Sequence, residues 1–247
     1  MADLPYISVV VPFYDEADSV DPVLDELFGV LERPGRPFEV VAVDDGSRDE
    51  TPARLRAQRI RRPALRVVRF ERNAGQSAAF SAGFRIARGG VIVTMDGDGQ
   101  NDPADIPRLL ERLKEADAVF GVRARRRDSW LRRISSRIGN AVRRAATGDR
   151  ARDTGCSLKA FPRDAATRIP AFNGMHRFLP ALLGYAGLRT AEVEVNHRPR
   201  ERGRSKYGVW NRLGRGIADL VGVRWLRKRW LAYRIAEIDG APPPTGQ

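Results

Sequence analysis

Residue types that build several common protein sites are scarce in this sequence of 247 residues. It has one cysteine, Cys156, which excludes a disulfide within the chain, fits the cytosol and predicts a small buried thiol. Its two histidines, His176 and His197, are too few and too far apart to predict a zinc site. A structural or hydrogen-bonding role is favoured for His176, and no serine, histidine and aspartate constellation can be argued from the sequence.

Long apolar runs and leader-like segments are also missing. No stretch of about 18 or more apolar residues occurs, so no transmembrane helix is predicted. The N-terminal MADLPYISVVVPFY has no basic region ahead of its apolar run, so no signal peptide is predicted. The 42% of hydrophobic residues still suffices for a real core, in one large α/β domain or two small ones.

Two nucleotide-binding signatures are absent as well. The sequence contains neither GxGxxG nor GxxxxGK[ST], so a dinucleotide cofactor is not expected and a P-loop enzyme is excluded. Nothing matches a helix-turn-helix, a zinc finger or an RNA-binding module, and we therefore predict no nucleic-acid partner despite the net charge of +13.

Charge is distributed unevenly along the chain. Residues 1–60 carry 13 acidic and 6 basic side chains, whereas residues 121–150 carry 2 and 10, and residues 198–234 carry 2 and 12. This asymmetry predicts a first part that binds a cation and a nucleotide and later parts that face anions.

Apolar runs alternate with stretches of helical periodicity up to about residue 122. This order predicts a largely parallel sheet with helices on both faces. The expected strands are 7–14, 38–47, 65–70, 91–95 and 118–122, and the expected helices are 19–32, 51–60, 73–87 and 103–116. Ser19 is the expected N-cap of the first helix. Further along, we expect helices at 129–147 and 174–186, a strand at 190–199 and a basic loop from 200 to 208.

Three of the expected strands end in polar residues, and parallel strands would bring these ends to one edge, where ligands of such sheets bind. Asp96-Gly97-Asp98-Gly99-Gln100 places two carboxylates and an amide oxygen in one turn, the donor types that Mg²⁺ and Mn²⁺ prefer. An ordinary polar turn is the alternative. A calcium loop of the twelve-residue type is excluded, because the required glutamate is absent from its last position.

Other polar residues at the same edge suggest a nucleotide and its phosphates. Asp44 and Asp45 could hold a ribose or a base edge, with Tyr14 and Glu16 reaching the same ligand, or could form a turn before a helix. Two basic clusters could clamp a pyrophosphate or an acceptor phosphate, or could be solvated charge runs. They comprise Arg123, Arg125, Arg126 and Arg127, and then Arg198, Arg200, Arg202, Arg204 and Lys206.

The C-terminal segment interleaves aromatic and aliphatic residues with arginine and lysine. Such a pattern suits amphipathic helices lying in a membrane interface, and a helix packed on the rest of the domain is the alternative. The residues concerned include Trp210, Leu213, Ile217, Leu220, Val221, Trp225, Trp230 and Leu231.

Six motifs in order carry a resemblance to a known family. They are VVVPFYDEADSV, VDDGSRDET, RNAGQSAAFSAGF, MDGDGQNDPADIP, DTGCSLKAF and RGRSKYG. Together they resemble family 2 glycosyltransferases of the GT-A fold, and most closely the branch that transfers sugars to polyprenyl phosphates, over about residues 6–230. The resemblance implies an α/β GT-A domain at 1–208, with a nucleotide-sugar half at 1–122 and an acceptor half at 123–208. Amphipathic helices would follow at 209–238 and a disordered tail at 239–247.

The resemblance also implies a role for each matching position. Nucleotide-sugar binding falls to Pro12, Tyr14, Glu16, Asp44, Asp45, Gly75 and Asp96. Asp96, Asp98 and Gln100 would bind the metal, and Asp96, Asp98 and Arg123 would be catalytic. The acceptor phosphate would contact Arg132, Ser136, Arg202 and Lys206. Gly99 departs from the family pattern, in which a bulkier residue usually precedes the glutamine.

The implied reaction is an inverting transfer from a nucleotide-diphosphate sugar to a polyprenyl phosphate, dependent on Mg²⁺ or Mn²⁺. It would occur at the inner face of the cytoplasmic membrane, reached through amphipathic helices or a small integral membrane partner. Three alternatives remain at this point. They are a family 2 enzyme with a non-lipid acceptor, a nucleotidyltransferase that releases pyrophosphate, and a nucleic-acid binder.

Overall fold

The computed structural model describes residues 7–33, 35, 37–123, 141–199 and 209–231. Within these ranges the chain forms one seven-stranded sheet with the order β3-β2-β1-β4-β6-β5-β7. Neighbouring strands run parallel except at β6, which is antiparallel to both β4 and β5. The strands are β1 (Ile7–Phe13), β2 (Phe38–Asp44), β3 (Leu65–Arg69), β4 (Val91–Thr94), β5 (Ala118–Arg123), β6 (Lys159–Pro162) and β7 (Thr190–Val195).

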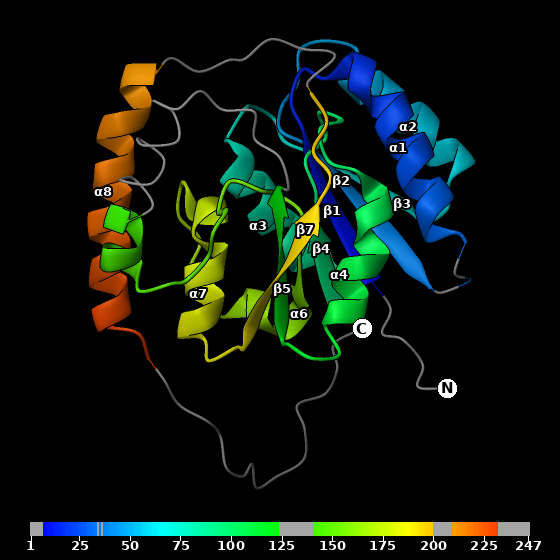
Figure 1. Ribbon diagram of the computed structural model, residues 1–247. Coiled ribbons are helices and arrows are strands. Elements are labelled where there is room, and N and C mark those ends of the chain that lie inside the picture. The colour runs from blue at the N-terminus through cyan, green and yellow to red at the C-terminus, as the bar shows by residue number, and fades with distance from the viewer. Residues whose placement is uncertain (1–6, 34, 36, 124–140, 200–208, 232–247) are drawn as a thin grey trace, which may run out of the picture.

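Helices cover both faces of the sheet and produce a layered molecule (Figure 1). One face carries α1 (Ala17–Leu31), α2 (Thr51–Arg61) and, after the short η1 (Pro103–Asp105), α4 (Ile106–Arg112). The other face carries α3 (Gln76–Ile86), α6 (Arg163–Thr167), η2 (Met175–Arg177) and α7 (Leu179–Tyr185). The long helix α8 (Val209–Lys228) packs outermost on that second side, and residues 141–147 are also helical.

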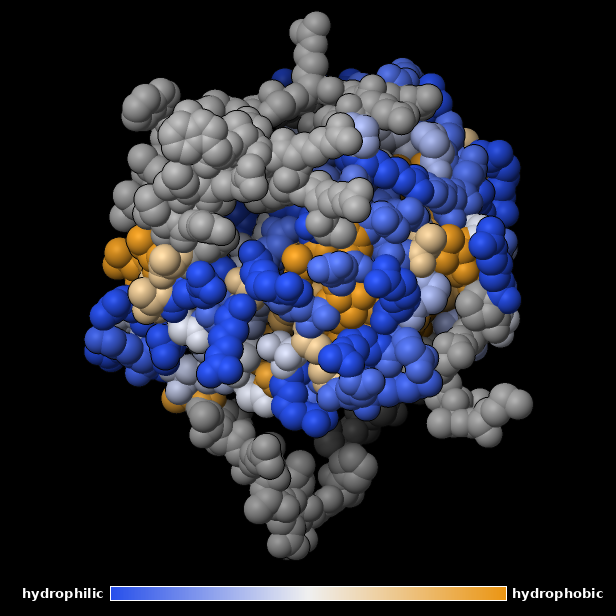
Figure 2. Space-filling model, in the orientation of Figure 1, coloured by the Kyte–Doolittle hydropathy of each residue, from blue (hydrophilic) through white to orange (hydrophobic). Residues whose placement is uncertain are grey.

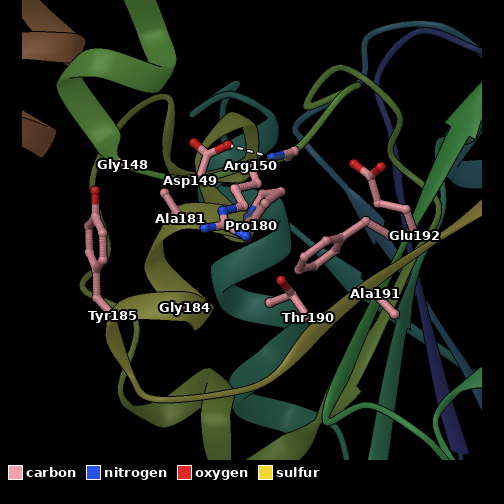
Figure 3. Close-up of a pocket in the computed structure, with 12 residues that line it drawn as sticks. Gly148, Asp149, Arg150, Pro180, Ala181, Gly184, Tyr185, Thr190, Ala191 and Glu192 are labelled. Carbon is pink, nitrogen blue, oxygen red and sulfur yellow. Dashed lines mark hydrogen bonds between the residues drawn. The ribbon is translucent and has the colours of Figure 1, made fainter.

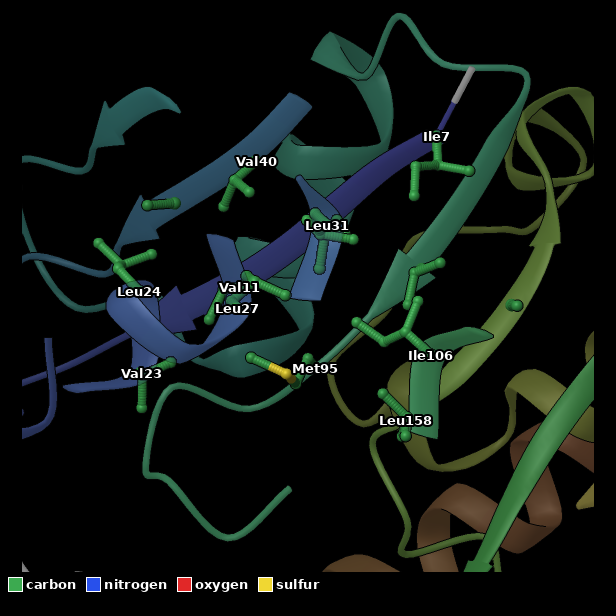
Figure 4. Close-up of a cluster of buried hydrophobic side chains, with 14 of the residues drawn as sticks. Ile7, Val11, Val23, Leu24, Leu27, Leu31, Val40, Met95, Ile106 and Leu158 are labelled. Atoms are coloured by element: carbon green, nitrogen blue, oxygen red, sulfur yellow. The ribbon is translucent and has the colours of Figure 1, made fainter. Parts of the chain in front are cut away.

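Alternation along the central strand explains why the sheet needs helices on both sides. Val9 and Val11 of β1 face α1, whereas Val10 between them faces α3, and all three are fully buried. Figure 4 shows the buried apolar cluster on the α1 side of the sheet, in which Leu24 and Leu27 of α1 lie over β1. Strands buried on both faces read as continuous apolar runs, and this is why ISVVVPF predicted a strand.

The first half of the chain confirms the expected order of strands and helices, with one correction at the start of α1. The helix begins at Ala17, and the backbone N–H groups of Ser19 and Val20 already donate to the carbonyl of Glu16. Ser19 is therefore a buried residue of the first turn rather than the N-cap, and Glu16 occupies the cap position.

The second half differs more from expectation. DTGCSLKAFPR leads into β6, an antiparallel strand inserted between two parallel neighbours, and this strand was not predicted. The helix expected over 174–186 is divided into η2 and α7, and α6 was missed. Short helices and a four-residue strand carry too little periodicity to be recognised from sequence.

Helix α8 is only partly buried. Val223 is 1% exposed and packs into the core, whereas Val221 and Trp225 are 64% and 60% exposed. Figure 2 shows the side of the molecule over α8 with apolar side chains beside strongly hydrophilic ones. No helix within the described ranges is both long enough and apolar enough to cross a membrane.

Candidate active site

The carboxyl ends of β1, β2 and β4 meet at one edge of the sheet. Phe13 of β1 pairs with Asp44 of β2, and Val10 of β1 pairs with Thr94 of β4, all in parallel register. The polar residues that follow these three strands are thus brought together, as the sequence predicted.

The loops after β1 and β2 hold each other through side chain to backbone hydrogen bonds. The Asp15 N–H donates to Ser47 Oγ at 2.9 Å, and the Arg48 N–H donates back to Asp15 Oδ1 at 2.8 Å. Asp15 has a φ of +47°, a strained conformation that these two bonds stabilise. The neighbouring Glu16 N–H donates to Thr51 Oγ1 at 2.9 Å, so the backbone of the predicted nucleotide segment has a fixed course.

The two predicted acids after β2 are both buried and both engaged. Asp44 Oδ1 accepts the Ser47 N–H at 2.9 Å, and Asp44 Oδ2 lies 3.3 Å from Arg69 Nε, an ion pair without good hydrogen-bond geometry. Asp45 accepts hydrogen bonds from Asn73 Nδ2 at 2.8 Å and from the Ala74 N–H at 2.7 Å.

Asp45 also contacts another predicted site residue, Gly75. The Gly75 N–H donates to Asp45 Oδ2 at 2.9 Å, and Gly75 has a φ of +92°, which favours glycine. Burial raises the pKa of the Asp45 carboxyl, although the Ala74 and Gly75 N–H groups oppose this shift. Asp45 thus fixes the loop before α3, and direct nucleotide contact by Asp44, Asp45 and Gly75 stays a prediction.

The Asp96–Gln100 turn follows β4 and lies against the end of β1. Gln76 Nε2 of α3 donates to Asp96 Oδ1 at 2.6 Å, and the Gln100 N–H donates to Asp98 Oδ1 at 3.1 Å. Both aspartates are partly exposed. At Gly99, φ is +76°, which suits the glycine that departs from the family pattern.

The donor atoms of this turn fit a hard divalent cation. Two carboxylates and one amide oxygen are the ligand types that Mg²⁺ and Mn²⁺ take, with the remaining positions filled by water or substrate phosphates. Within the described ranges no group of three or more histidine, cysteine, aspartate or glutamate side chains could hold a metal. Gln100 and oxygens of the substrate would therefore have to complete the coordination.

Arg123, at the end of β5, is oriented by a partner that the sequence analysis missed. Its Nε donates to Asp153 Oδ2 at 2.6 Å and its Nη2 to Asp153 Oδ1 at 2.8 Å, a bidentate pair with both side chains largely buried. Burial alone would lower the pKa of Arg123, but Asp153, and to a lesser degree Asp96, raise it overall. The signal for Asp153 was present in the DTGCSLKAF motif, to which no role had been given.

A buried polar layer joins β6 to the Asp96–Gln100 turn. Ser157 Oγ donates to Asn101 Oδ1 at 2.7 Å, and the same oxygen accepts the Asp96 N–H at 3.1 Å. Lys159 is 3% exposed, and its Nζ donates to the carbonyl of Cys156. Burial lowers the pKa of Lys159 and raises the pKa of Cys156, which is buried as expected.

His176 has the hydrogen-bonding environment that the sequence favoured. Its Nδ1 lies 2.7 Å from Ser77 Oγ, which itself accepts the Gly174 N–H at 2.8 Å. Which of Ser77 Oγ and Nδ1 donates depends on the tautomer of the imidazole. Burial, and then the positive charge of Lys159, lowers the pKa of His176 to about 3.

Of the remaining predicted residues, three lie at the same edge of the sheet and four lie outside the described residues. Pro12, Tyr14 and Glu16 lie at or just after the carboxyl end of β1 and are partly exposed. The predicted acceptor-phosphate residues lie outside the described residues. They are Arg132, Ser136, Arg202 and Lys206.

A separate hollow of about 490 Å³ lies between α7, the first residues of β7 and residues 148–151 (Figure 3). Arg150 and Tyr185 are among the residues that line it. None of the predicted site residues does so.

Comparisons with known proteins identify the chain's relatives. The family model described as "Glycosyl transferase family 2" matches residues 8–169. The dodecaprenyl-phosphate galacturonate synthase of Rhizobium johnstonii is 40% identical over 230 residues, covering 90% of this chain and 67% of that protein. The undecaprenyl-phosphate 4-deoxy-4-formamido-L-arabinose transferase of Edwardsiella ictaluri is 38% identical over 209 residues, covering 83% and 64%. The chain thus spans about two thirds of the length of these relatives.

Solved structures confirm the predicted fold class. The glucosyl-3-phosphoglycerate synthase of Mycobacterium tuberculosis, in complex with phosphoglyceric acid, superposes with a TM-score of 0.66 at 21% identity, covering 90% of this chain and 80% of that chain. A mannosyltransferase from Pyrobaculum calidifontis, in complex with GDP-Man and Mn²⁺, gives 0.64 at 24% identity, covering 97% and 66%. The fold is the α/β GT-A type, and the chain belongs to glycosyl transferase family 2.

Proposed function

We propose that this protein transfers a sugar from a nucleotide-diphosphate sugar to a polyprenyl phosphate. The observation that carries the proposal is the meeting of the Asp96–Gln100 turn and the Arg123–Asp153 pair at one sheet edge. The dodecaprenyl-phosphate galacturonate synthase and the undecaprenyl-phosphate 4-deoxy-4-formamido-L-arabinose transferase match 90% and 83% of this chain, and this supports a polyprenyl-phosphate acceptor.

Asp96, Asp98 and Gln100 are the residues that would hold a divalent cation. Such a cation, when bound, neutralises charge that develops on the departing diphosphate. The mannosyltransferase crystallised with GDP-Man and Mn²⁺ has the same fold, and this supports Mn²⁺ or Mg²⁺ as the metal. Gln76 and Asn101 would orient the Asp96 carboxylate and backbone for this purpose.

The acceptor phosphate needs to be oriented for attack rather than deprotonated by a general base. A phosphate oxygen of the lipid is already ionised near pH 7, so it needs orientation by cations more than a general base. Arg123, held charged and rigid by Asp153, would supply one such cation, with Arg132, Ser136, Arg202 and Lys206 proposed for the rest. A single displacement would invert the configuration at the anomeric carbon, and a product that retains it would contradict this mechanism.

Contact with the membrane would come from α8. Val221 and Trp225 are exposed on this helix, with the exposed residues Arg224 and Lys228 near them in sequence and the Arg229 guanidinium over the Trp225 ring. Apolar residues flanked by cations suit an anionic lipid surface, which supports peripheral attachment at the inner face of the cytoplasmic membrane, alone or with a small integral membrane partner.

The test is transfer of radiolabel from a panel of nucleotide sugars to undecaprenyl phosphate in vesicles, with Mg²⁺ or Mn²⁺ and with or without EDTA. The panel includes nucleotide-linked galacturonic acid and 4-deoxy-4-formamido-L-arabinose, UDP-glucose and GDP-mannose. We expect metal-dependent label in the organic phase from one donor, and loss of that label in Asp96→Asn and Asp98→Asn variants.

The other outcomes separate the alternatives. In a parallel assay with phosphoglyceric acid added as a soluble acceptor, label that reaches only a water-soluble product would replace the lipid acceptor by a soluble one. Release of pyrophosphate from a nucleoside triphosphate would indicate a nucleotidyltransferase instead. Label transfer that persists in EDTA would overturn the proposed metal dependence.

A further inference from the structure

The three residues after β7 run alongside the metal-binding turn and the segment that follows it. The Asn196 N–H donates to Asp105 Oδ2 at 2.6 Å, and Asn101 forms an antiparallel bridge with His197. The Arg198 N–H then donates to the carbonyl of Gln100 at 2.9 Å. Two segments almost a hundred residues apart in sequence are thereby paired at the edge of the candidate active site.

The side chain of Arg198 fixes this pairing against α1. Its Nη1 and Nη2 donate to Glu26 Oε2 and Oε1 at 2.7 Å and 2.6 Å, and its Nη2 lies 3.1 Å from Asp102 Oδ2. These contacts, above all those with Glu26, raise the pKa of Arg198. A planar guanidinium can span two carboxylates in this way, whereas the single ammonium of a lysine cannot reproduce the fork.

Gln100 lies directly in this arrangement. Its side-chain Nε2 donates to the carbonyl of Arg198 at 3.4 Å, and its backbone N–H donates to Asp98 Oδ1 at 3.1 Å. Because the amide nitrogen is engaged with Arg198, the direction of the amide oxygen depends on where the Arg198 backbone is held. That oxygen is the third donor of the proposed metal site.

We propose that Arg198 is a positioning residue for the metal-binding turn. This inference rests on the proposed function, because it takes Asp96, Asp98 and Gln100 as metal donors. Because its guanidinium is already engaged by Glu26 and Asp102, Arg198 acts by anchoring Gln100 and Asp102 to α1 rather than by contacting a ligand. Partners that orient metal ligands change metal affinity about 10–100-fold when they are removed.

The experiment compares Mn²⁺ binding by the wild-type chain of 247 residues and by its Arg198→Gln variant, with free Mn²⁺ followed by electron paramagnetic resonance. Arg54→Gln is the matched control. Arg54, in α2, pairs with Asp21 of α1, the helix that also carries Glu26. The side chains of Arg54 and Asp21 are 43% and 35% exposed, close to the 41% and 39% of Arg198 and Glu26. We expect about tenfold weaker Mn²⁺ binding for Arg198→Gln. We expect the same loss for Arg198→Lys, because lysine cannot reproduce the fork, and no change for Arg54→Gln.

Transfer kinetics provide the second readout. The concentration of Mn²⁺ that gives half-maximal activity should rise by the same factor in Arg198→Gln, with kcat close to wild type at saturating Mn²⁺. If Arg198→Gln does not fold, Glu26→Gln removes the bidentate partner while the backbone pairing stays, and weaker Mn²⁺ binding is expected again. Wild-type affinity in these variants would overturn the role of Arg198 and leave the metal site standing, whereas a wild type that binds no Mn²⁺ would overturn both.

Discussion

At Gly97, between the two aspartates, the fold leaves no room for a side chain. A Cβ there would lie 2.6 Å from the Pro12 carbonyl oxygen and 2.6 Å from the Phe13 ring. Gly97→Ala must therefore displace the Asp96–Gln100 turn from the end of β1. We expect a loss of about 1–3 kcal/mol in the free energy of unfolding, together with weaker Mn²⁺ binding, measured by urea denaturation and by metal titration.

Gly29 supplies the control for this substitution. It lies in α1 with nothing within 4 Å of a Cβ, so Gly29→Ala should stabilise the protein by up to about 1 kcal/mol and leave metal binding intact. Equal effects of the two substitutions would mean that the close approach at Gly97 does not shape the turn.

The buried His176 should make the stability of the protein depend on pH. Its pKa in the folded protein is about 3, below the value of 6.5 for an ordinary histidine, so the unfolded chain binds a proton that the folded chain does not. Stability is then fully present above pH 6.5 and falls as the pH drops toward 3, by at most about 1.4 kcal/mol per pH unit. Between pH 6.5 and 5, His176→Gln should flatten the decline of the urea midpoint. An unchanged decline would show that this histidine is not the source.

Among the elements, β6 and the segment before it have the largest effect on the site. This stretch supplies Asp153 to Arg123 and Ser157 to Asn101, and so supports both the Arg123 guanidinium and the Asp96–Gln100 turn. Asp153→Asn leaves Arg123 buried without its charged partner, which typically costs about 3–5 kcal/mol. We expect a large drop in the urea midpoint and a lower kcat in the transfer assay.

Asp117→Asn is the comparison for Asp153→Asn. Asp117 also pairs with an arginine, Arg189, but both side chains are exposed, so little change in stability is expected. A small effect at Asp153, similar to that at Asp117, would mean that Arg123 finds another partner when Asp153 is neutral.

Helix α8 carries the proposed contact with lipid. Val221→Glu and Trp225→Glu place charges on exposed positions, so we expect nearly unchanged stability and reduced binding to anionic vesicles in sedimentation assays. Ile60→Glu, on the exposed side of α2, adds the same charge at a residue that is 84% exposed and should not affect vesicle binding. Equal losses from both helices would point to net charge alone rather than to α8.

For the whole molecule, the sequence predicted the parts of the fold that follow from strong periodicity. The runs ISVVVPF, FEVVAVD and VIVT are buried on both faces, and the parallel direction predicted for them brings the acids to one edge of the sheet. What it could not predict depends on contacts between distant residues. Antiparallel β6, the Asp153–Arg123 pair and the Arg198 anchor all join segments at least 30 residues apart, and no local pattern marks them.

The charge of the whole chain should govern its first contact with a lipid surface. A net charge of +13, with the bases concentrated after residue 120, should draw the protein to anionic lipid by about 1 kcal/mol for each Lys or Arg near the surface. Salt shortens the range of this attraction from about 10 Å at 0.1 M to about 3 Å at 1 M. Binding to anionic vesicles should therefore fall steeply with salt, while a residual fraction bound through the apolar residues of α8 persists and is lost in Trp225→Glu. Binding that ignores salt, or equal binding to neutral vesicles, would contradict electrostatic attraction as the first step of membrane contact.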